Sequence, residues 1–487
     1  MKKQAVNPYL PSYEYIPDGE PYVYGERLYV FGSHDRFNGI QFCMNDYVCW
    51  SAPVDDLSDW KYEGVIYKKS QDPYAKEDSI MQAPDMVQGP DGRYYLYYTL
   101  GLIPFMCVAV SDKLTGPYNF LGCVKDKNGQ PIGLRGKGDL GQRDLFQFDP
   151  GIFKDDDGRI FLYSGFAPGS EGIFAAAYKK YHLDGAYVME LEEDMLTIKA
   201  EPKRILPDVA DSKGTGFEGH EFYEASSMRK INGRYYFIYS SILQHELCYA
   251  TSKYPDREFV FGGTLVSNGD IGYKGQTEPL NYTGNTHGSV VNVKGQWYVF
   301  YHRQTNRHNY SRQACAEKIY LDENGQFSQV EITSCGLNGQ PLEGTGTYPA
   351  YIACNLWSKE GALKYGTAAT PEAEHHPYFT QTGDDREVNG DQYIANMQDG
   401  ATAGYKYFSF AGLKKIAVAV SGDGTGIMKV RNAWKKTIIA EIHLNALDNE
   451  IRWFDAECTT PNIMGEHALY FTYEGRGVIH FHEFAFV

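Results

Sequence analysis

The sequence predicts an all-β protein: a five-bladed β-propeller followed by a β-sandwich of the jelly-roll type. Its 487 residues include 40 Tyr, 26 Phe and 51 Gly. Aromatic residues favour strands, whereas glycine favours the turns between them. One hairpin pattern returns five times between residues 18 and 303. Beyond residue 350 this pattern stops, and short stretches of alternating apolar and polar residues continue.

The repeated pattern is a tight turn followed by a basic or amide residue and an aromatic strand. Its copies are residues 25–31, 91–97, 157–163, 232–238 and 294–300. Asp-Gly and Asn-Gly pairs ahead of alternating apolar residues are a strong hairpin signal. The second turn residues are 66, 66, 75 and 62 positions apart, which leaves room for a four-stranded sheet in each copy. Five such sheets around a channel make a propeller. A long β-sandwich with similar hairpins explains the near-regular spacing less well.

A second domain is expected after the repeats. Residues 336–350 hold four Gly and two Pro, a composition typical of a loop or linker. We therefore expect the propeller over residues 1–340 and the β-sandwich over residues 350–487. Three strands are expected in the second domain, at residues 415–420, 468–473 and 478–484.

Charge and cysteine usage exclude several classes of partner. The formal charge is −16, which argues against nucleic acid, because its phosphates need a basic surface. No apolar run approaches the ~20 residues of a membrane span, and residues 1–15 lack the apolar core of a secretion signal. Nine cysteines stand singly, without C-x-x-C spacing, so neither disulfides nor a zinc site is indicated. We expect a soluble, cytoplasmic protein with buried free thiols and no membrane partner.

A polar residue stands seven to nine positions before each repeated turn. In chain order these residues are Asp18, Asp85, Asp149, Glu224 and His287. In a propeller the strand that begins there lines the channel, so we expect these side chains to meet at one rim. The unequal offsets require bulges in some of these strands. A single Asp at such a place could be a turn cap. Four converging carboxylates instead raise one pKa, so that a protonated acid coexists with an ionised base, as glycosidic hydrolysis requires.

Motifs in all five repeats resemble glycoside hydrolase family 43. They include Asn7-Pro-Tyr-Leu-Pro11, Ala83-Pro-Asp85, Phe148-Asp-Pro-Gly-Ile-Phe153, Phe222-Tyr-Glu-Ala-Ser-Ser227 and Asn285-Thr-His-Gly-Ser289. The match spans residues 7–330. The C-terminal stretches 391–396, 403–408 and 468–473 resemble a family 6-like carbohydrate-binding module. Tyr393, Tyr405, Trp434 and Trp453 are its candidate sugar-stacking residues, among which the sequence does not select, and a purely structural role of this domain is the alternative.

The resemblance implies a role for each matching residue. Asp18 stands where the family has its general base, and Glu224 where it has its general acid. Asp149 matches a third carboxylate that orients the acid and tunes its pKa. His287 resembles a channel histidine that often holds a hydrated calcium ion. Arg312 matches an arginine expected to contact the bound sugar.

Neighbouring groups leave alternatives open. Glu218 and Glu221 stand close to Glu224 and could serve as the acid. Glu221 lies at an odd offset and faces away on a regular strand, whereas Glu218 lies in a Gly-rich loop. His34 either lines the sugar pocket or pairs with Asp35. His287 could also be a plain structural histidine, because calcium prefers oxygen ligands.

Together these features predict an inverting exo-glycosidase that releases terminal α-L-arabinofuranose or β-D-xylose from hemicellulose-derived oligosaccharides. Inversion is implied by the resemblance. Exo action is expected because a cytoplasmic enzyme meets imported oligosaccharides rather than insoluble polymer. Calcium is the expected ion, and no organic cofactor is expected.

Three other functions remain open at this level. An endo-arabinanase or a galactanase of the same family would differ only in loop shape. A non-catalytic carbohydrate-binding propeller would share the aromatic richness but would need no matched acid and base. A retaining fructosidase-type propeller is disfavoured, because residues 16–21 read Ile-Pro-Asp-Gly-Glu-Pro and Ala225, not Cys, follows Glu224.

Overall fold

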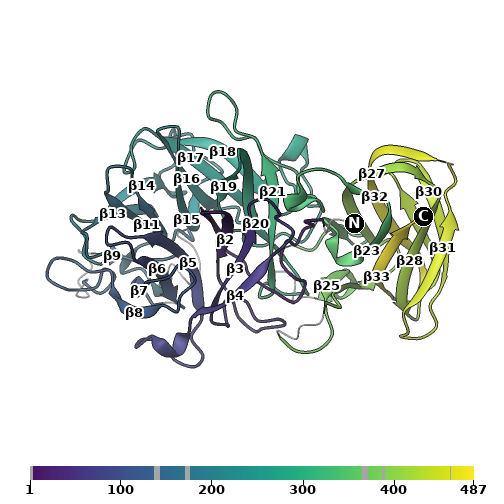
Figure 1. Cartoon of the computed structure of the whole chain (residues 1–487), viewed down its shortest axis with the longest axis horizontal. Coiled ribbons are helices and arrows are strands. Elements are labelled where there is room, and N and C mark those ends of the chain that lie inside the picture. The colour runs from purple at the N-terminus through teal and green to yellow at the C-terminus, as the bar shows by residue number, and fades with distance from the viewer. Residues whose placement is uncertain are drawn as a thin grey trace.

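The computed structural model describes residues 4–101, 103–135, 143–169, 176–364, 371–385, 390–460 and 462–487. These residues form two β-domains that lie side by side, with the N- and C-terminal residues both near the second domain (Figure 1). Five short 3₁₀ turns have their bounds within the described residues: η1 (Lys69–Gln71), η2 (Tyr273–Gly275), η3 (Gly336–Asn338), η4 (Ala350–Ile352) and η5 (Pro371–His375). In the part of the chain described, no helix has the length and apolar character to cross a membrane.

Five antiparallel sheets build the first domain, one for each copy of the repeated hairpin. The first contains β1 (Glu20–Tyr24), β2 (Arg27–Phe31), β3 (Tyr47–Pro53) and β4 (Lys61–Tyr67). The second contains β5 (Met81–Gln88), β6 (Tyr94–Leu100), β7 (Cys107–Ser111) and β8 (Asn119–Cys123). The third contains β10 (Gly151–Lys154), β11 (Ile160–Ser164), β13 (Gly185–Leu191) and β14 (Lys203–Pro207).

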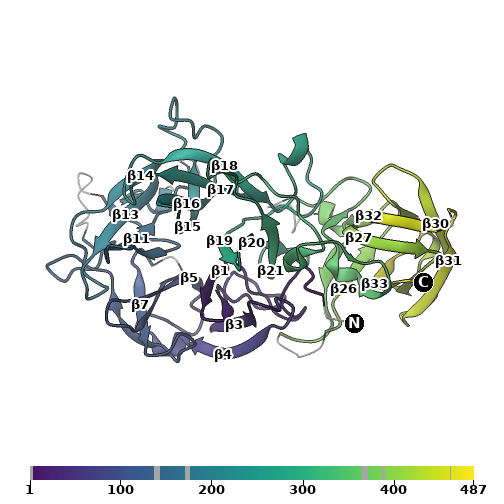
Figure 2. The ribbon, with the colours of Figure 1, turned by 45° about the horizontal axis from the view of Figure 1, so that its top comes forward.

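The fourth contains β15 (Phe222–Ile231), β16 (Arg234–Ser241), β17 (Glu246–Ser252) and β18 (Val260–Ser267). The fifth contains β19 (Val290–Val293), β20 (Gln296–Gln304) and β21 (Arg312–Ile319). A short parallel pair, β9 (Asp144–Leu145) with β12 (Tyr181–His182), lies outside these sheets. Figure 2 shows the five sheets arranged in a ring, with β1, β5, β15 and β19 toward its centre. The predicted five-bladed propeller is confirmed.

The repeated turns join the first and second strands of each blade, as predicted. Asn232 and Gly233 have φ of 50° and 77°, and Lys294 and Gly295 have φ of 52° and 88°. Two successive positive φ values are the geometry of tight hairpin turns that match strand twist. The Asn-Gly signal therefore identified the correct connections.

The N-terminal segment closes the ring. The Tyr9 amide donates to the Ala314 carbonyl of β21 at 3.2 Å, and the Asn7 side chain bonds both the amide and the carbonyl of Ala316. Gly19 and Gly288 form a parallel bridge between the first and fifth blades. Residues 7–9 thus occupy the outer edge of the three-stranded fifth blade, which ties the start of the domain to its end.

The second domain is a sandwich of two six-stranded sheets. One contains β22 (Leu342–Glu343), β24 (Asn355–Trp357), β27 (Thr402–Leu413), β29 (Thr425–Arg431), β30 (Ile438–Asn445) and β32 (Ile463–Arg476). The other contains β23 (Gly346–Pro349), β25 (Tyr378–Thr380), β26 (Tyr393–Met397), β28 (Lys415–Gly422), β31 (Arg452–Glu457) and β33 (Ile479–Phe486). Phe408, Phe471, Phe481 and Phe484 are fully buried between them. The first two strands expected in this domain lie within β28 and β32, and the third matches β33 except that β33 begins one residue later, at Ile479.

The expected linker at residues 336–350 is wrong in part. β22 pairs with β27, and β23 pairs with β33, so residues 342–349 already belong to the sandwich. Short edge strands tolerate Gly and Pro because one of their sides needs no ladder partner. The composition of this segment therefore resembles that of a loop.

Candidate active site

A cavity of about 300 Å³ lies where the innermost strands of all five blades begin. The five blades contribute Asp18, Ala83, Asp149, Glu224 and His287 to its wall. The structure thus brings the three predicted catalytic carboxylates to one rim, as the repeat phase required. Arg312, at the start of β21, also lines the cavity.

The backbone at this rim is unusual. Asp18 and Asp149 each stand two residues before a strand, with φ of 59° and 43°. Asp is one of the residues that tolerates this left-handed region. Ala225, directly after Glu224, has φ of 71°, which is uncommon for a residue with a Cβ and concentrates at functional sites.

The bulges required by the unequal offsets are present. β5 shifts register between Gln82 and Asp85, and β15 shifts on both sides of Glu224. Asp85, expected at the same rim, does not line the cavity, because it accepts hydrogen bonds from the Tyr22 hydroxyl at 2.5 Å and from the Ile152 amide at 2.7 Å. These bonds connect the first three blades.

Asp18 is held in its ionised form. An Arg312 Nη donates to Asp18 Oδ1 at 2.9 Å, and the ring of His302 lies 3.4 Å from the same oxygen. Burial alone would raise the pKa of Asp18, but the charge of Arg312, together with His302 and His287, holds it below its usual value. Asp35 fixes the guanidinium from the other side, accepting hydrogen bonds from Nε at 2.8 Å and Nη2 at 3.0 Å.

Glu224 is in the opposite state. Its burial and the nearby charge of Asp18 raise its pKa to about 8. Burial, followed by the charges of Glu224 and Asp18, likewise raises the pKa of Asp149 well above its ordinary value. One cavity therefore combines a carboxyl group whose pKa is lowered with two whose pKa values are raised, and Glu224, with a pKa of about 8, keeps its proton at neutral pH. This is the electrostatic pattern of an acid–base pair.

His287 lies among these carboxylates. Its Nδ1 is 3.6 Å from Asp149 Oδ2 and 4.0 Å from Asp18 Oδ1, so these two oxygens are less than 8 Å apart. Asp18 and Asp149 are thus neighbours around the His287 ring. Burial lowers the pKa of His287, so its ring is neutral near pH 7.

Two buried polar atoms near these carboxylates have no hydrogen-bond partner among the described residues: Nε2 of His287 and Oε1 of Glu20. They lie 4.0 Å apart. The other oxygen of Glu20 accepts from Arg229 Nη2 at 2.6 Å. A neutral imidazole and a carboxylate oxygen fit a hydrated cation, with water supplying most of the six to eight oxygen ligands of calcium. The residues present fit the expected ion.

His34 does not reach the cavity. It is 2% exposed, and its Nδ1 lies 2.8 Å from the Asp46 carbonyl oxygen. Its Nε2 faces Glu14 at 3.7 Å, and Asp35 is committed to Arg312. His34 is thus buried beside the cavity residues without being one of those that line the cavity.

The competing acids lie elsewhere. Glu218 is exposed, and its carboxylate accepts the Gly214 amide of its own loop. Glu221 is buried and accepts the Ser212 hydroxyl at 2.7 Å. Neither lines the cavity.

Several site residues were missed from the sequence. The apolar side of the cavity consists of Phe42, Phe146, Phe148, Phe166 and Tyr223. The alternating aromatic residues directly before Asp149 were a usable signal, since side chains two apart on an extended segment share a face. The Asn285 side chain hydrogen-bonds to Glu224. Asn285 belongs to the motif Asn285-Thr-His-Gly-Ser289, which was noted for its histidine alone. Glu20, in contrast, had no signal of its own.

The structure narrows the sugar-stacking candidates of the second domain. Tyr405 is fully buried in the core, and Tyr393 stacks on His482 at 4.7 Å. Trp434 packs on Trp357 with ring centroids 4.8 Å apart. Trp453 is 48% exposed on β31. Sugar binding by this domain stays a prediction.

Comparison with known proteins adds a separate observation. The model of glycosyl hydrolases family 43 matches residues 14–327. A protein named xylosidase/arabinosidase from Thermoclostridium stercorarium is 48% identical over 484 residues, covering 98% of each chain.

Solved structures show the same fold. A family 43 arabinoxylan arabinofuranohydrolase from Bacillus subtilis, in complex with cellotetraose, has a TM-score of 0.51 at 20% identity. The match covers 100% of this chain and 98% of that one. A family 43 β-xylosidase/α-arabinofuranosidase from a compost metagenome, a calcium-free form with xylotriose, has a TM-score of 0.51 at 23% identity. It covers 68% of this chain and 98% of that one.

Proposed function

Because this chain belongs to glycoside hydrolase family 43 and is a glycoside hydrolase, we propose that it removes terminal pentoses from hemicellulose-derived oligosaccharides with inversion. The observation that carries the proposal is the pair of opposite protonation states at one cavity. Asp18 is ionised beside Arg312, while Glu224 keeps its proton. A binding site would need neither state, whereas hydrolysis needs both.

The reaction follows from these states. Asp18 takes a proton from a water molecule, whose oxygen attacks the anomeric carbon. Glu224 gives its proton to the departing glycosidic oxygen as the bond to that carbon breaks. Water thus supplies the new hydroxyl group, and attack opposite the leaving group inverts the configuration.

Asp149 and Arg312 are positioning residues in this scheme. Burial and then the charge of Glu224 raise the pKa of Asp149, so ionisation of Glu224 favours the protonated form of Asp149. The Arg312 guanidinium donates one hydrogen bond to Asp18. It donates two more to Asp35, which hold it in place. The base is therefore oriented before substrate arrives.

The cavity favours exo action on a small terminal sugar. Its volume of about 300 Å³ is at the low end for ligand sites. One side is aromatic, suited to the apolar face of a sugar ring, and the other is polar. The xylosidase/arabinosidase relative supports β-D-xylose and α-L-arabinofuranose as the sugars released.

Calcium, when bound, would supply positive charge beneath the carboxylates and hold Asp18 ionised. His287 Nε2 and Glu20 Oε1 are the atoms that would face the hydrated ion. We also place the reaction in the cytoplasm. All nine cysteines are free thiols, eight of them buried, which supports a reducing compartment.

A direct test uses p-nitrophenyl β-D-xylopyranoside and p-nitrophenyl α-L-arabinofuranoside. The wild type should release nitrophenol from one or both, and Asp18→Asn should lose about 10²–10⁴-fold in rate on each. Binding of xylo-oligosaccharides without any hydrolysis would instead support the carbohydrate-binding propeller.

A further inference from the structure

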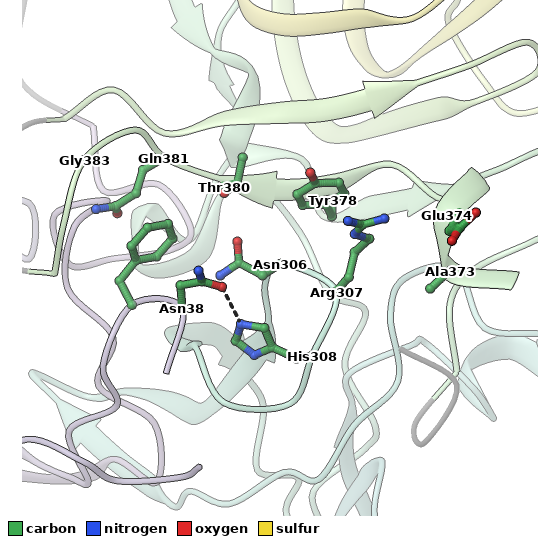
Figure 3. Close-up of a pocket in the computed structure, with 11 residues that line it drawn as sticks. Asn38, Asn306, Arg307, His308, Ala373, Glu374, Tyr378, Thr380, Gln381 and Gly383 are labelled. Atoms are coloured by element: carbon green, nitrogen blue, oxygen red, sulfur yellow. Dashed lines mark hydrogen bonds between the residues drawn. The ribbon is translucent and has the colours of Figure 1, made fainter. Parts of the chain in front are cut away.

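A second, larger cleft of about 660 Å³ lies where the propeller meets the sandwich. The propeller contributes residues from two loops, 32–46 after β2 and 305–311 after β20. The sandwich contributes residues 373–383, around β25. Figure 3 shows Asn306 and Arg307 of the first domain facing Thr380 and Tyr378 of the second.

Hydrogen bonds join the two domains at this cleft. The Asn306 amide donates to the Phe379 carbonyl at 2.8 Å. Asp385 of the sandwich accepts from the Phe37 amide at 2.6 Å and from Asn45 Nδ2 at 2.9 Å. The cleft walls are therefore preformed, which reduces the entropic cost of binding.

The lining is suited to a neutral polyhydroxylated ligand. Amide, hydroxyl, guanidinium and carboxylate side chains all line it, and the opposite charges of Arg307 and Glu374 cancel. The Arg307 guanidinium lies 5.1 Å from the centre of the Tyr378 ring. Asn306 is 6% exposed, and its Nδ2 has no hydrogen-bond partner among the described residues. An unpaired buried donor costs free energy unless a ligand or water satisfies it.

The cleft and the active site share a wall. His308 lines the cleft and stacks on Tyr310 at 5.6 Å. Tyr310 meets the edge of Phe42 at 4.9 Å, and Phe42 lines the active-site cavity, with its ring 4.7 Å from the Arg312 guanidinium.

The wall is thin. Asn38 of the cleft and Phe42 of the cavity are four residues apart in the chain, so their Cα atoms are at most about 14 Å apart. A short oligosaccharide spans this distance.

We propose that the interdomain cleft is a distal subsite for the sugar units of an oligosaccharide whose terminal pentose occupies the active site. Tyr378 would offer its ring to a sugar face, and Asn306, Arg307 and Thr380 would hydrogen-bond its hydroxyl groups. This inference rests on the proposed function, because it names where the rest of that substrate lies. It also gives the second domain a part in selecting longer substrates.

The test compares long and short substrates in the full-length chain. The kcat/KM is measured for the better p-nitrophenyl glycoside and for xylotetraose, with and without an arabinofuranosyl branch. Tyr378→Ala and Arg307→Ala should each lower the ratio of oligosaccharide to aryl-glycoside kcat/KM about two- to tenfold, the value of one net hydrogen bond. Arg307 is exposed, so its variant should fold even if Tyr378→Ala does not.

Tyr320→Ala is the matched control. Tyr320 is 67% exposed on the propeller and lines neither cavity, so its ratio should equal that of the wild type. An unchanged ratio in both cleft variants overturns the subsite while leaving the glycosidase standing. If the wild type hydrolyses none of the p-nitrophenyl glycosides or oligosaccharides, the proposed function is contradicted, and the subsite that rests on it is contradicted too.

Discussion

Replacing Glu224 by Gln tests the acid most sharply. The environment raises the pKa of Glu224 from 4.5 to about 8. At pH 7 a carboxyl group of pKa 8 is about 90% protonated, whereas one of pKa 4.5 is about 0.3% protonated. The burial of Glu224 and the charge of Asp18 therefore increase the amount of usable acid about 300-fold.

The raised pKa of Glu224 and the lowered pKa of Asp18 predict the direction in which kcat/KM changes with pH. The acid must be protonated, so kcat/KM of the wild type should fall as pH rises through about 8. The base must be ionised, so kcat/KM should also fall at acidic pH, below the ordinary pKa of Asp, because the pKa of Asp18 is lowered. In Glu224→Gln the alkaline decline should vanish, because an amide does not titrate in this range.

The size of the rate loss in Glu224→Gln should depend on the leaving group of the substrate. Substrates with a sugar leaving group need protonation, so Glu224→Gln should slow them about 10²–10⁴-fold. Activated aryl glycosides need little protonation and should be slowed far less. Glu218→Gln, an exposed glutamate outside the cavity, should keep the wild-type profile. An alkaline decline that persists unchanged in Glu224→Gln, or equal losses on both substrate classes, would refute the assignment.

Two other predictions follow from the same cavity. Arg312→Gln removes the charge that lowers the pKa of Asp18, so the acidic decline of kcat/KM should move up by about 1–3 pH units. Arg312→Lys should shift it less, and an unmoved limb in a folded Arg312→Gln protein would contradict the pairing. The purified protein should contain calcium, lose activity on exhaustive chelation and regain it with added calcium; His287→Ala should weaken that response. A metal-free, fully active enzyme would leave His287 as a structural residue.

The blades and the rim were predictable because they depend on local signals. Each hairpin is encoded within seven residues, and rotational repetition then fixes which strand starts meet. Asp18, Asp149 and Glu224 could thus be brought together from their phase alone.

The remaining features of the site depend on contacts between residues that are far apart in the sequence. Arg312 meets Asp18 only because the fifth blade closes against the first, 294 positions apart. Glu20 faces His287 across the same closure, and nothing in its own neighbourhood signals this. The surroundings of His34 likewise depend on residues distant in sequence, because its Nδ1 lies 2.8 Å from the carbonyl oxygen of Asp46 and its Nε2 3.7 Å from Glu14. The interdomain cleft requires the docking of two domains, on which sequence periodicity carries no information.

The measurement that tests the central claim most directly is proton NMR of the sugar during the first minutes of hydrolysis. With an ionised Asp18 activating water and a protonated Glu224 opposite, a β-D-xyloside should yield the α-anomer of xylose first, before mutarotation mixes the two. If the enzyme acts on the arabinofuranoside, the β-anomer of arabinose should come first. First release of the anomer with retained configuration would mean that a carboxylate attacks the sugar, and would contradict the roles given to Asp18 and Glu224.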